Sequence, residues 1–260
     1  MKDSNAKREE LEQKIKEFCL LDDDFMNRVF DENIECMELI LRIILDDPGI
    51  RVREVHTQRE IRNLRGHSVR LDIYATAANG EPINIEIQRA EKGAGVKRAR
   101  YNSGMLDTNM LVRGEDYDCL PESYVIFITE TDIMGRNIPL YHVDRVVAET
   151  GEPFGDGAHI IYVNGAYRDD SPIGKLMHDF SCKQASDMYY QPLAEQVRYY
   201  KESAEGVSAM CRIMEELIDS EKKEIALRML EDNVLPIEKI AKYSGLTFEQ
   251  VEELAKLQTS

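Results

Sequence analysis

The sequence is poor in cysteine and has no long apolar run. Its five cysteines are far apart, odd in number and without paired metal-ligand spacing, which excludes a disulfide scaffold and predicts reduced thiols. No stretch approaches the ~20 apolar residues of a membrane span, and the charged segment 1–17 does not have the pattern of a signal peptide. We therefore expect a cytoplasmic protein that does not enter membranes.

Positive charge is also scarce, because 33 Lys and Arg residues face 49 Asp and Glu residues, giving a net charge of −16. Repulsion from a polyanion argues against non-specific binding of nucleic acid. Two segments are nevertheless locally basic: 51–70, with six arginines and two glutamates, and a second stretch with Arg89, Lys92, Lys97, Arg98 and Arg100. The negative net charge therefore argues against nucleic-acid binding but does not exclude it.

The hydrophobic content of 43% supports one substantial core with an appendage. Periodicity predicts a charged arm or helix over 1–21, one or two helices over 24–44, a strand over 50–55, a helix over 96–111, and strands over 124–128 and 159–163. Helical periodicity returns after Pro172, and 191–260 shows no clear strand. We expect an α/β domain over 22–190, built on a mixed β-sheet flanked by helices, and an all-helical C-terminal region over 191–260.

The segment 69–90 carries the clearest signal. Apolar and polar residues alternate over 69–74 and over 83–88, which predicts a hairpin around Ala78-Asn79-Gly80. Opposed residues of an antiparallel pair point to the same face. A two-residue turn would oppose Asp72 to Ile87, whereas a three-residue loop over 78–80, with Gly80 in the left-handed position, opposes Asp72 to Glu86. Both acids, and Gln88 two residues on, then share a polar face.

Two converging carboxylates suit a hard divalent ion such as Mg²⁺ or Mn²⁺. Beside a phosphodiester such an ion would activate a water for hydrolysis, and the amide of Gln88 could orient that water or bind a phosphate oxygen. By spacing alone, however, one Asp and one Glu on a hairpin are more often solvated surface residues.

Arg70-Leu71-Asp72 followed by Ile85-Glu86-Ile87-Gln88 resembles the catalytic hairpin of the PD-(D/E)XK nuclease superfamily, and in particular its recombination-promoting nuclease and transposase branch. Supporting matches are Asp24-Phe25 with Phe30, Lys97-Arg98-Ala99 with Tyr101, and Gly114-Glu115-Asp116-Tyr117. The resemblance covers 22–190. It implies a restriction-endonuclease-like core, a Mg²⁺- or Mn²⁺-dependent DNA endonuclease, Asp72 and Glu86 as metal ligands, and Gln88 at the superfamily's lysine position.

The chain departs from the superfamily pattern at three points. Leu71 stands in the place of the proline, and Gln88 brings no charge, so we expect Lys97 or Arg98 to supply it. The first-helix acid is either Asp24, which fits the branch motif and is favoured, or Glu35. A phosphate contact is expected from Arg98 with Tyr101 on the same helix face, although a packed tyrosine with a snorkelling arginine fits the spacing equally well.

Structural roles are expected for two other sets of residues, three histidines and the last two predicted helices. His142, His159 and His178 show no ligand spacing, so we expect surface or core positions for them. Segments 236–241 and 247–254 around Ser244-Gly245-Leu246, with Thr247 as N-cap, resemble a helix-turn-helix. Because Glu249, Glu252 and Glu253 give the second helix the wrong sign for DNA, we favour a packing unit or a contact between copies of the chain.

The leading function is therefore metal-dependent DNA cleavage. One alternative is a catalytically silent DNA-binding or regulatory protein that keeps the nuclease fold, suggested by the missing lysine and the acidity. The other is a protein-interaction module that uses the acidic C-terminal region.

Overall fold

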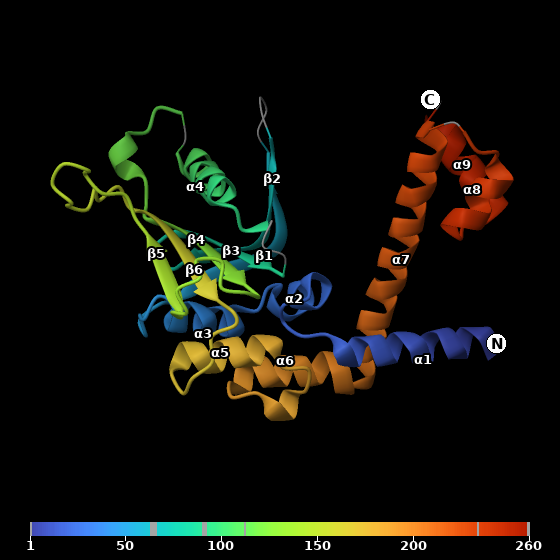
Figure 1. Cartoon of the computed structure of the whole chain (residues 1–260), viewed down its shortest axis with the longest axis horizontal. Coiled ribbons are helices and arrows are strands. Elements are labelled where there is room, and N and C mark those ends of the chain that lie inside the picture. The colour runs from blue at the N-terminus through green and yellow to red at the C-terminus, as the bar shows by residue number, and fades with distance from the viewer. Residues whose placement is uncertain (1, 63–66, 90–92, 112, 233, 259–260) are drawn as a thin grey trace. The chain divides into compact units, whose positions relative to one another are not determined.

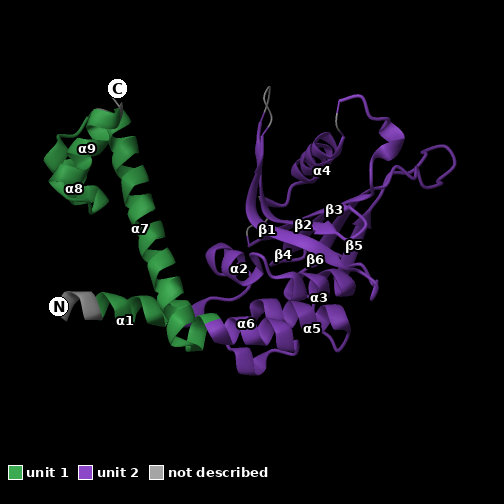
Figure 2. Cartoon of the chain, turned by 180° about the vertical axis from the view of Figure 1, so that it is seen from behind, with its two compact units in different colours: residues 1–15, 200–260 green, residues 16–199 purple. Residues whose placement is uncertain are grey.

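The computed structural model describes residues 2–62, 67–89, 93–111, 113–232 and 234–258. Arg65 and Lys92 of the predicted basic stretches lie outside the described residues. The chain divides into two compact units, formed by residues 16–199 and by residues 1–15 together with 200–260 (Figure 2).

Residues 16–199 contain a six-stranded sheet in the order β1-β2-β3-β4-β6-β5 (Figure 1). Strands β1, β2 and β3 pair antiparallel, β3, β4 and β6 pair parallel, and β5 pairs antiparallel with β6. The strands are β1 (Val52–Ile61), β2 (Val69–Ala77), β3 (Pro82–Gln88), β4 (Ser123–Thr129), β5 (Leu140–Val143) and β6 (Ala158–Asn164). The sheet is therefore mixed, as predicted.

Helices cover both faces of this sheet. Helix α4 lies over one face, and α3 and α5 lie over the other (Figure 1). The helices at least partly within this unit are α1 (Lys2–Glu17), α2 (Asp23–Phe30), α3 (Ile34–Ile44), α4 (Val96–Met110), α5 (Pro172–Ser181) and α6 (Gln191–Glu202), with short 3-10 turns η2 (Tyr117–Cys119) and η3 (Ala185–Asp187). The predicted fold class, a mixed sheet flanked by helices, is confirmed.

The β2–β3 hairpin has the register that its sequence predicts. Ile73 pairs with Ile85 and Thr76 with Pro82, which leaves Ala78, Asn79 and Gly80 as the loop. Gly80 has a φ of +98°, a conformation that costs glycine little because it has no Cβ. Continued by one residue, this register sets Asp72 opposite Glu86.

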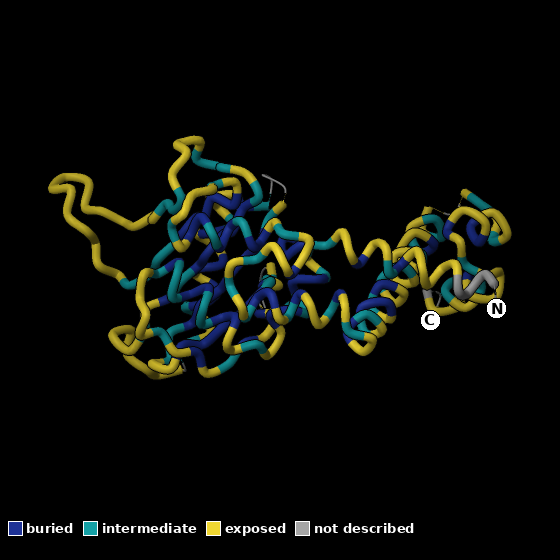
Figure 3. Tube along the Cα trace, turned by 90° about the horizontal axis from the view of Figure 1, so that it is seen from below, coloured by how far each residue is buried: buried dark blue, intermediate teal, exposed yellow. Residues whose placement is uncertain are grey.

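Strands β3 and β4 consist almost entirely of buried residues, as expected for β4, and the buried interior of the chain is drawn in dark blue in Figure 3. On the α4 side, the ring of Phe127 stacks on that of Tyr162 with centroids 5.3 Å apart, and Ala99 and Leu106 of α4 belong to the same core. Glu86 also lies on this side and has no exposed surface. Helix α4 thus covers the predicted polar face at Glu86, whereas Asp72 and Gln88 on the same face stay partly exposed.

Other elements differ from the periodicity in detail. Strand β1 extends to Ile61, and β5 was not predicted because its four residues are too short for a periodic pattern. In the described part of the chain, no helix is both long and apolar enough to cross a membrane.

Within the second unit, α7 (Ala204–Asp232), α8 (Ile237–Ser244) and α9 (Phe248–Gln258) pack around Ala226, Ile240 and Val251. Gly245 ends α8 with a φ of +73°. Thr247 Oγ1 accepts the Gln250 N–H at 3.2 Å and Gln250 Oε1 accepts the Thr247 N–H at 2.8 Å, which is a capping box. The all-helical C-terminal region and the N-cap are confirmed, whereas a contact between copies remains a prediction.

Candidate active site

Asp72 lies where strands β2 and β3 separate. The pairing runs from Thr76 to Ile73, and at the next residue the Asp72 side chain replaces a backbone acceptor, because its Oδ2 accepts the Ile87 N–H at 3.1 Å. On the other side of β2, Gln58 lies between the partners of Leu71 and Ile73 and has a φ of +54°, which is rare for a residue with a Cβ. The sheet is therefore irregular around Asp72, and the carboxylate is held by the neighbouring backbone.

Glu86 is enclosed by polar side chains from β3 and α4. Its Oε1 accepts the side-chain amides of Asn84 at 3.1 Å and Asn102 at 3.3 Å, and its Oε2 forms an ion pair with the Arg98 guanidinium. Arg98 also donates to the Gly93 carbonyl at 3.1 Å. Helix α4 thus supplies one charge and one amide to a carboxylate that has no contact with solvent.

Asn84 contributes an unusual atom to this network. It is fully buried, and while its Nδ2 donates to Glu86, its Oδ1 has no hydrogen-bond partner among the described residues. A buried acceptor without a partner costs ~1–3 kcal/mol. The fold accepts this cost beside Glu86, which indicates that the Asn84 amide is kept in place to bind the Glu86 carboxylate.

Gln88 turns its amide toward Asp72. Gln88 Nε2 lies 3.4 Å from Asp72 Oδ2. A Cβ placed on Gly93 would come within 1.6 Å of Gln88 Oε1, so the absence of a side chain at Gly93 makes room for the amide. The three residues predicted for the site, Asp72, Glu86 and Gln88, are thus brought together.

Burial is the main reason why both carboxyl groups have raised pKa values. Burial raises the pKa of Asp72 to about 6, with a further increase from the charge of Asp23 and opposing effects from the Ile87 N–H and Arg98. Burial, then the charge of Asp72, raises the pKa of Glu86 to about 7, against the effect of Arg98. The two carboxylates therefore repel each other, and the positive charge of Arg98 compensates for this only in part.

Helix α2 brings acids to the same place. The charge of Asp23, in the first turn of α2, raises the pKa of Asp72. Asp24, the acid predicted from the sequence, is the next residue along the chain and is partly buried. The charge of Glu35, the other candidate, raises the pKa of the Cys36 thiol, as does the charge of Glu195 of α6. Arg89 fixes the start of α2 next to the end of β3 through its ion pair with Asp22.

A basic cavity of about 560 Å³ is lined by Arg98 and Asn102, the two residues of α4 that contact Glu86. Its described lining has no carboxylate, and Lys97 and Arg98 are among its five basic residues. Tyr101, a residue that is 39% exposed, lines it too, and its hydroxyl donates to the His67 carbonyl at 2.5 Å. The lining residues are His67, Ser68, Val69, Arg70, Lys97, Arg98, Arg100, Tyr101 and Asn102. An anionic ligand fits this lining.

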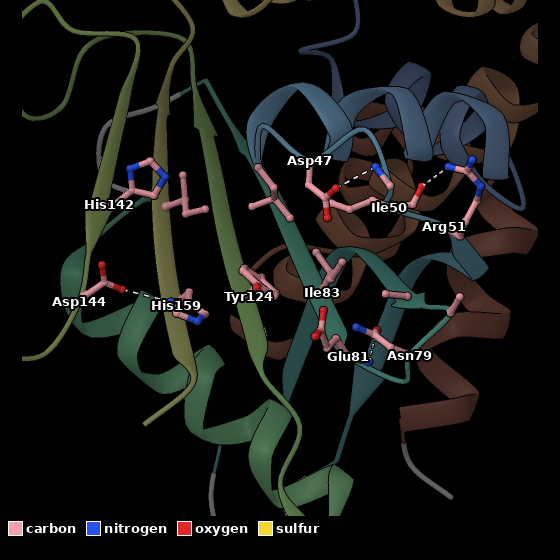
Figure 4. Close-up of a pocket in the computed structure, with 15 residues that line it drawn as sticks. Asp47, Ile50, Arg51, Asn79, Glu81, Ile83, Tyr124, His142, Asp144 and His159 are labelled. Atoms are coloured by element: carbon pink, nitrogen blue, oxygen red, sulfur yellow. Dashed lines mark hydrogen bonds and ion pairs between the residues drawn. The ribbon is translucent and has the colours of Figure 1, made fainter. Parts of the chain in front are cut away.

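A second cavity, of about 500 Å³, lies at the opposite end of β3, around the β2–β3 loop (Figure 4). Asp47, Glu81 and Asp144 line it with His142 and His159, and His159 Nδ1 lies 3.2 Å from Asp144 Oδ1. The charge of this lining disfavours a polyanion, so the two cavities differ in the ligands that they suit.

The raised pKa values predict how stability changes with pH. In the unfolded chain, Asp and Glu have pKa values of about 4. Between this value and those of the folded protein, near 6 for Asp72 and 7 for Glu86, the folded state binds more protons. The stabilising contribution of the pair is therefore fully present below about pH 4 and is lost as the pH rises through about 6 for Asp72 and about 7 for Glu86.

Thermal or urea unfolding between about pH 5 and pH 8 measures this loss. The double variant Asp72→Asn, Glu86→Gln should show a flatter stability profile over that range than the parent. Identical profiles for the two proteins would contradict a perturbed carboxyl pair.

Arg98→Ala should destabilise the protein by about 1–3 kcal/mol at neutral pH, because it leaves the buried Glu86 carboxylate without its ion pair. The loss should shrink below pH 6, where Glu86 is protonated in the variant. Arg100→Ala, which removes an exposed arginine of the same helix, is the matched control. Equal unfolding free energies for the two variants at pH 8 would show that Arg98 does not support Glu86.

Asn84, Asn102, Asp23 and Gly93 are the residues that the sequence analysis missed. Strand parity places Asn84 on the face of Glu86, and helical spacing places Asn102 one turn after Arg98, so both amides had a usable signal. Asp23 and Gly93 had none, because their proximity to Asp72 and Gln88 comes from tertiary packing.

The family model for PD-(D/E)XK nuclease family transposases matches residues 24–166, more than half of the chain. The match contains the β2–β3 hairpin, α4 and the strands that carry the site. Neither the curated proteins nor the solved structures gave a significant match. The chain therefore belongs to the PD-(D/E)XK nuclease family of transposases.

Proposed function

We propose that this protein is a Mg²⁺- or Mn²⁺-dependent DNA endonuclease whose metal ligands are Asp72 and Glu86. The observation that carries the proposal is the mutually repelling carboxyl pair at the end of the hairpin, in which Glu86 is fully buried and Asp72 partly buried. Carboxylate oxygens are the ligands that such hard ions prefer. Nucleases of this superfamily generally use divalent metals.

The donor atoms fit an ion of this kind. The hydrogen bonds from Ile87 and Gln88 both end on Asp72 Oδ2, which leaves Oδ1 for a metal. Glu86 Oε1 is held by two amides, whereas Oε2 faces the partly exposed Arg98 guanidinium. The Arg98 guanidinium thus lies beside Oε2, where a metal ion would bind. A bound cation would share the ion pair with Arg98 or replace it.

A bound divalent ion would act as a Lewis acid on the phosphate and lower the pKa of a nearby water. The residues of the chain would position the other reactants. Gln88 offers both ends of an amide to the attacking water or a phosphate oxygen. The first turn of α2 would provide the auxiliary acid, Asp24 by its motif and Asp23 by its charge interaction with Asp72.

The basic cavity would hold the DNA backbone next to the carboxylates. Lys97 and Arg98 supply positive charge there, and Tyr101 offers an exposed ring for stacking. A local basic surface would allow a chain of net charge −16 to approach DNA at this place. The function is then phosphodiester cleavage, related to transposition or recombination.

Plasmid nicking with and without Mg²⁺, beside Asp72→Ala, tests the proposal. We expect conversion of supercoiled to nicked or linear DNA with the parent only when Mg²⁺ or Mn²⁺ is present. Cleavage that persists in chelator, or that Asp72→Ala retains in full, would refute it.

A second candidate is a DNA-binding or regulatory protein that does not cleave. Two observations favour it: Gln88 has no charge, and the Glu86 carboxylate already forms an ion pair with Arg98. Binding to labelled DNA that is lost in Lys97→Gln and Arg100→Gln, without nicking in either metal, would support this candidate over the endonuclease.

A further inference from the structure

The C-terminal end of α5 carries three different metal-binding side chains close together. His178 Nδ1 lies 3.3 Å from Cys182 Sγ and 3.3 Å from Asp179 Oδ1. All three donor atoms lie within 4.8 Å of one another. For Zn²⁺ bonds of ~2.0–2.3 Å, neighbouring tetrahedral ligands are roughly 3.3–3.8 Å apart, so both distances from His178 Nδ1 suit this ion.

The carboxylate of this cluster is held rigidly. Asp179 is fully buried, and its Oδ1 and Oδ2 accept the backbone N–H groups of Tyr189 and Tyr190, each at 2.8 Å. A carboxylate oxygen has two acceptor positions. Oδ1 therefore keeps one for a further partner while the backbone fixes its direction.

The histidine has room to become a ligand. Cys182 Sγ lies 3.3 Å from Nδ1 and 3.7 Å from Nε2 of His178, so the sulfur lies over the ring and not on the axis of either nitrogen lone pair. Ligation requires the imidazole to turn about its Cβ–Cγ bond. The side chain of His178 is 36% exposed, with the Tyr189 ring against it at a centroid distance of 4.9 Å, so solvent and ions can reach it.

We propose that His178, Asp179 and Cys182 form a Zn²⁺ site, with water as the fourth ligand. A thiolate and an imidazole select Zn²⁺ over Mg²⁺, so this site differs in chemistry from the Asp72–Glu86 pair and does not depend on the endonuclease proposal. His178 was expected in a surface or core role because it shows no ligand spacing with the other histidines, but Cys182 lies one helical turn away from it.

Cobalt binding to the full-length reduced protein tests the proposal. After removal of metals by chelation, Co²⁺ titration should give near-ultraviolet thiolate-to-cobalt absorbance and intense visible bands of a tetrahedral site, saturating at one ion per chain. Zn²⁺ should abolish both. Absence of thiolate-to-cobalt absorbance in the parent would overturn the proposal, whatever the variants do.

Three variants locate the signal. Cys182→Ser should abolish the thiolate absorbance and weaken Zn²⁺ binding by more than about 100-fold, because losses of outer partners alone cost 10–100-fold. Cys119→Ser, which changes an exposed cysteine, should leave both unchanged. Asp72→Asn should also leave them unchanged, which separates this site from the proposed nuclease centre. Absorbance that survives in Cys182→Ser, or that is lost in Asp72→Asn, would overturn the assignment.

Discussion

Asp72→Asn and Glu86→Gln should each lower the Mg²⁺-dependent cleavage rate by about 10³-fold or more. A metal ion contributes several kcal/mol of charge stabilisation in the transition state, and each ~1.4 kcal/mol is a factor of ten in rate. Both substitutions keep the shape and the oxygen acceptor of the side chain but remove the negative charge that holds the ion. Single-turnover cleavage of a labelled duplex measures the loss.

Thermal melts in the absence of metal provide the control for these two variants. Removing one charge from a repelling pair, of which Glu86 is fully and Asp72 partly buried, should leave the unfolding temperature unchanged or raise it. A variant that cleaves at the parent's rate would exclude its carboxylate from the site. A loss of activity that merely follows a loss of stability would argue for a structural role.

Gln88→Ala should lower the cleavage rate on the order of 10²-fold, as is typical when one preorganised polar group is removed from a hydrolytic site. The alanine loses both hydrogen-bonding ends of the amide, including the contact with Asp72 Oδ2. Gln88→Lys should preserve activity, because it restores a positive charge beside the phosphate. Neutralising Lys97 and Arg98 together should then cost less in the Gln88→Lys background than in the parent.

Gly93 provides an independent way to move the Gln88 amide. Gly93→Ala places a methyl group in the space of Gln88 Oε1, whereas a Cβ on Gly95 meets no atom within 4 Å. We expect Gly93→Ala to reproduce most of the loss seen in Gln88→Ala, and Gly95→Ala to cleave like the parent. If Gln88→Ala itself cleaves at the parent's rate, Gln88 is a bystander and only the two carboxylates belong to the site.

The hairpin shows which features of the site can be predicted from the sequence and which cannot. Alternating side chains and the parity rule determine the register, so the pairing that opposes Asp72 to Glu86 could be predicted from residues 69–90 alone. The same pattern could not show that Glu86 is buried, because burial depends on α4, which covers this face only after the chain has folded. The apparent surface acid is therefore an interior carboxylate with two amides and an arginine around it.

Charge partners were harder to predict than fold. Lys97 and Arg98 were expected beside the phosphate, and the structure gives the two residues different surroundings: Arg98 pairs with Glu86, and Lys97 lies on the exposed side of the basic cavity. At the start of α2, the charge of Asp23 raises the pKa of Asp72, although the motif had pointed to the adjacent Asp24. Sequence periodicity fixes the face of an element, and tertiary packing decides which charge on that face meets which partner.

Binding of Mn²⁺, measured by its electron paramagnetic resonance signal, tests most directly whether Asp72 and Glu86 jointly hold a divalent ion. All samples should carry Cys182→Ser, so that the cluster at the end of α5 does not contribute. The parent sequence in this background should bind one Mn²⁺ per chain, and Asp72→Asn and Glu86→Gln should each abolish that binding. Unchanged Mn²⁺ affinity in the double variant Asp72→Asn, Glu86→Gln would contradict the metal site and the cleavage mechanism built on it.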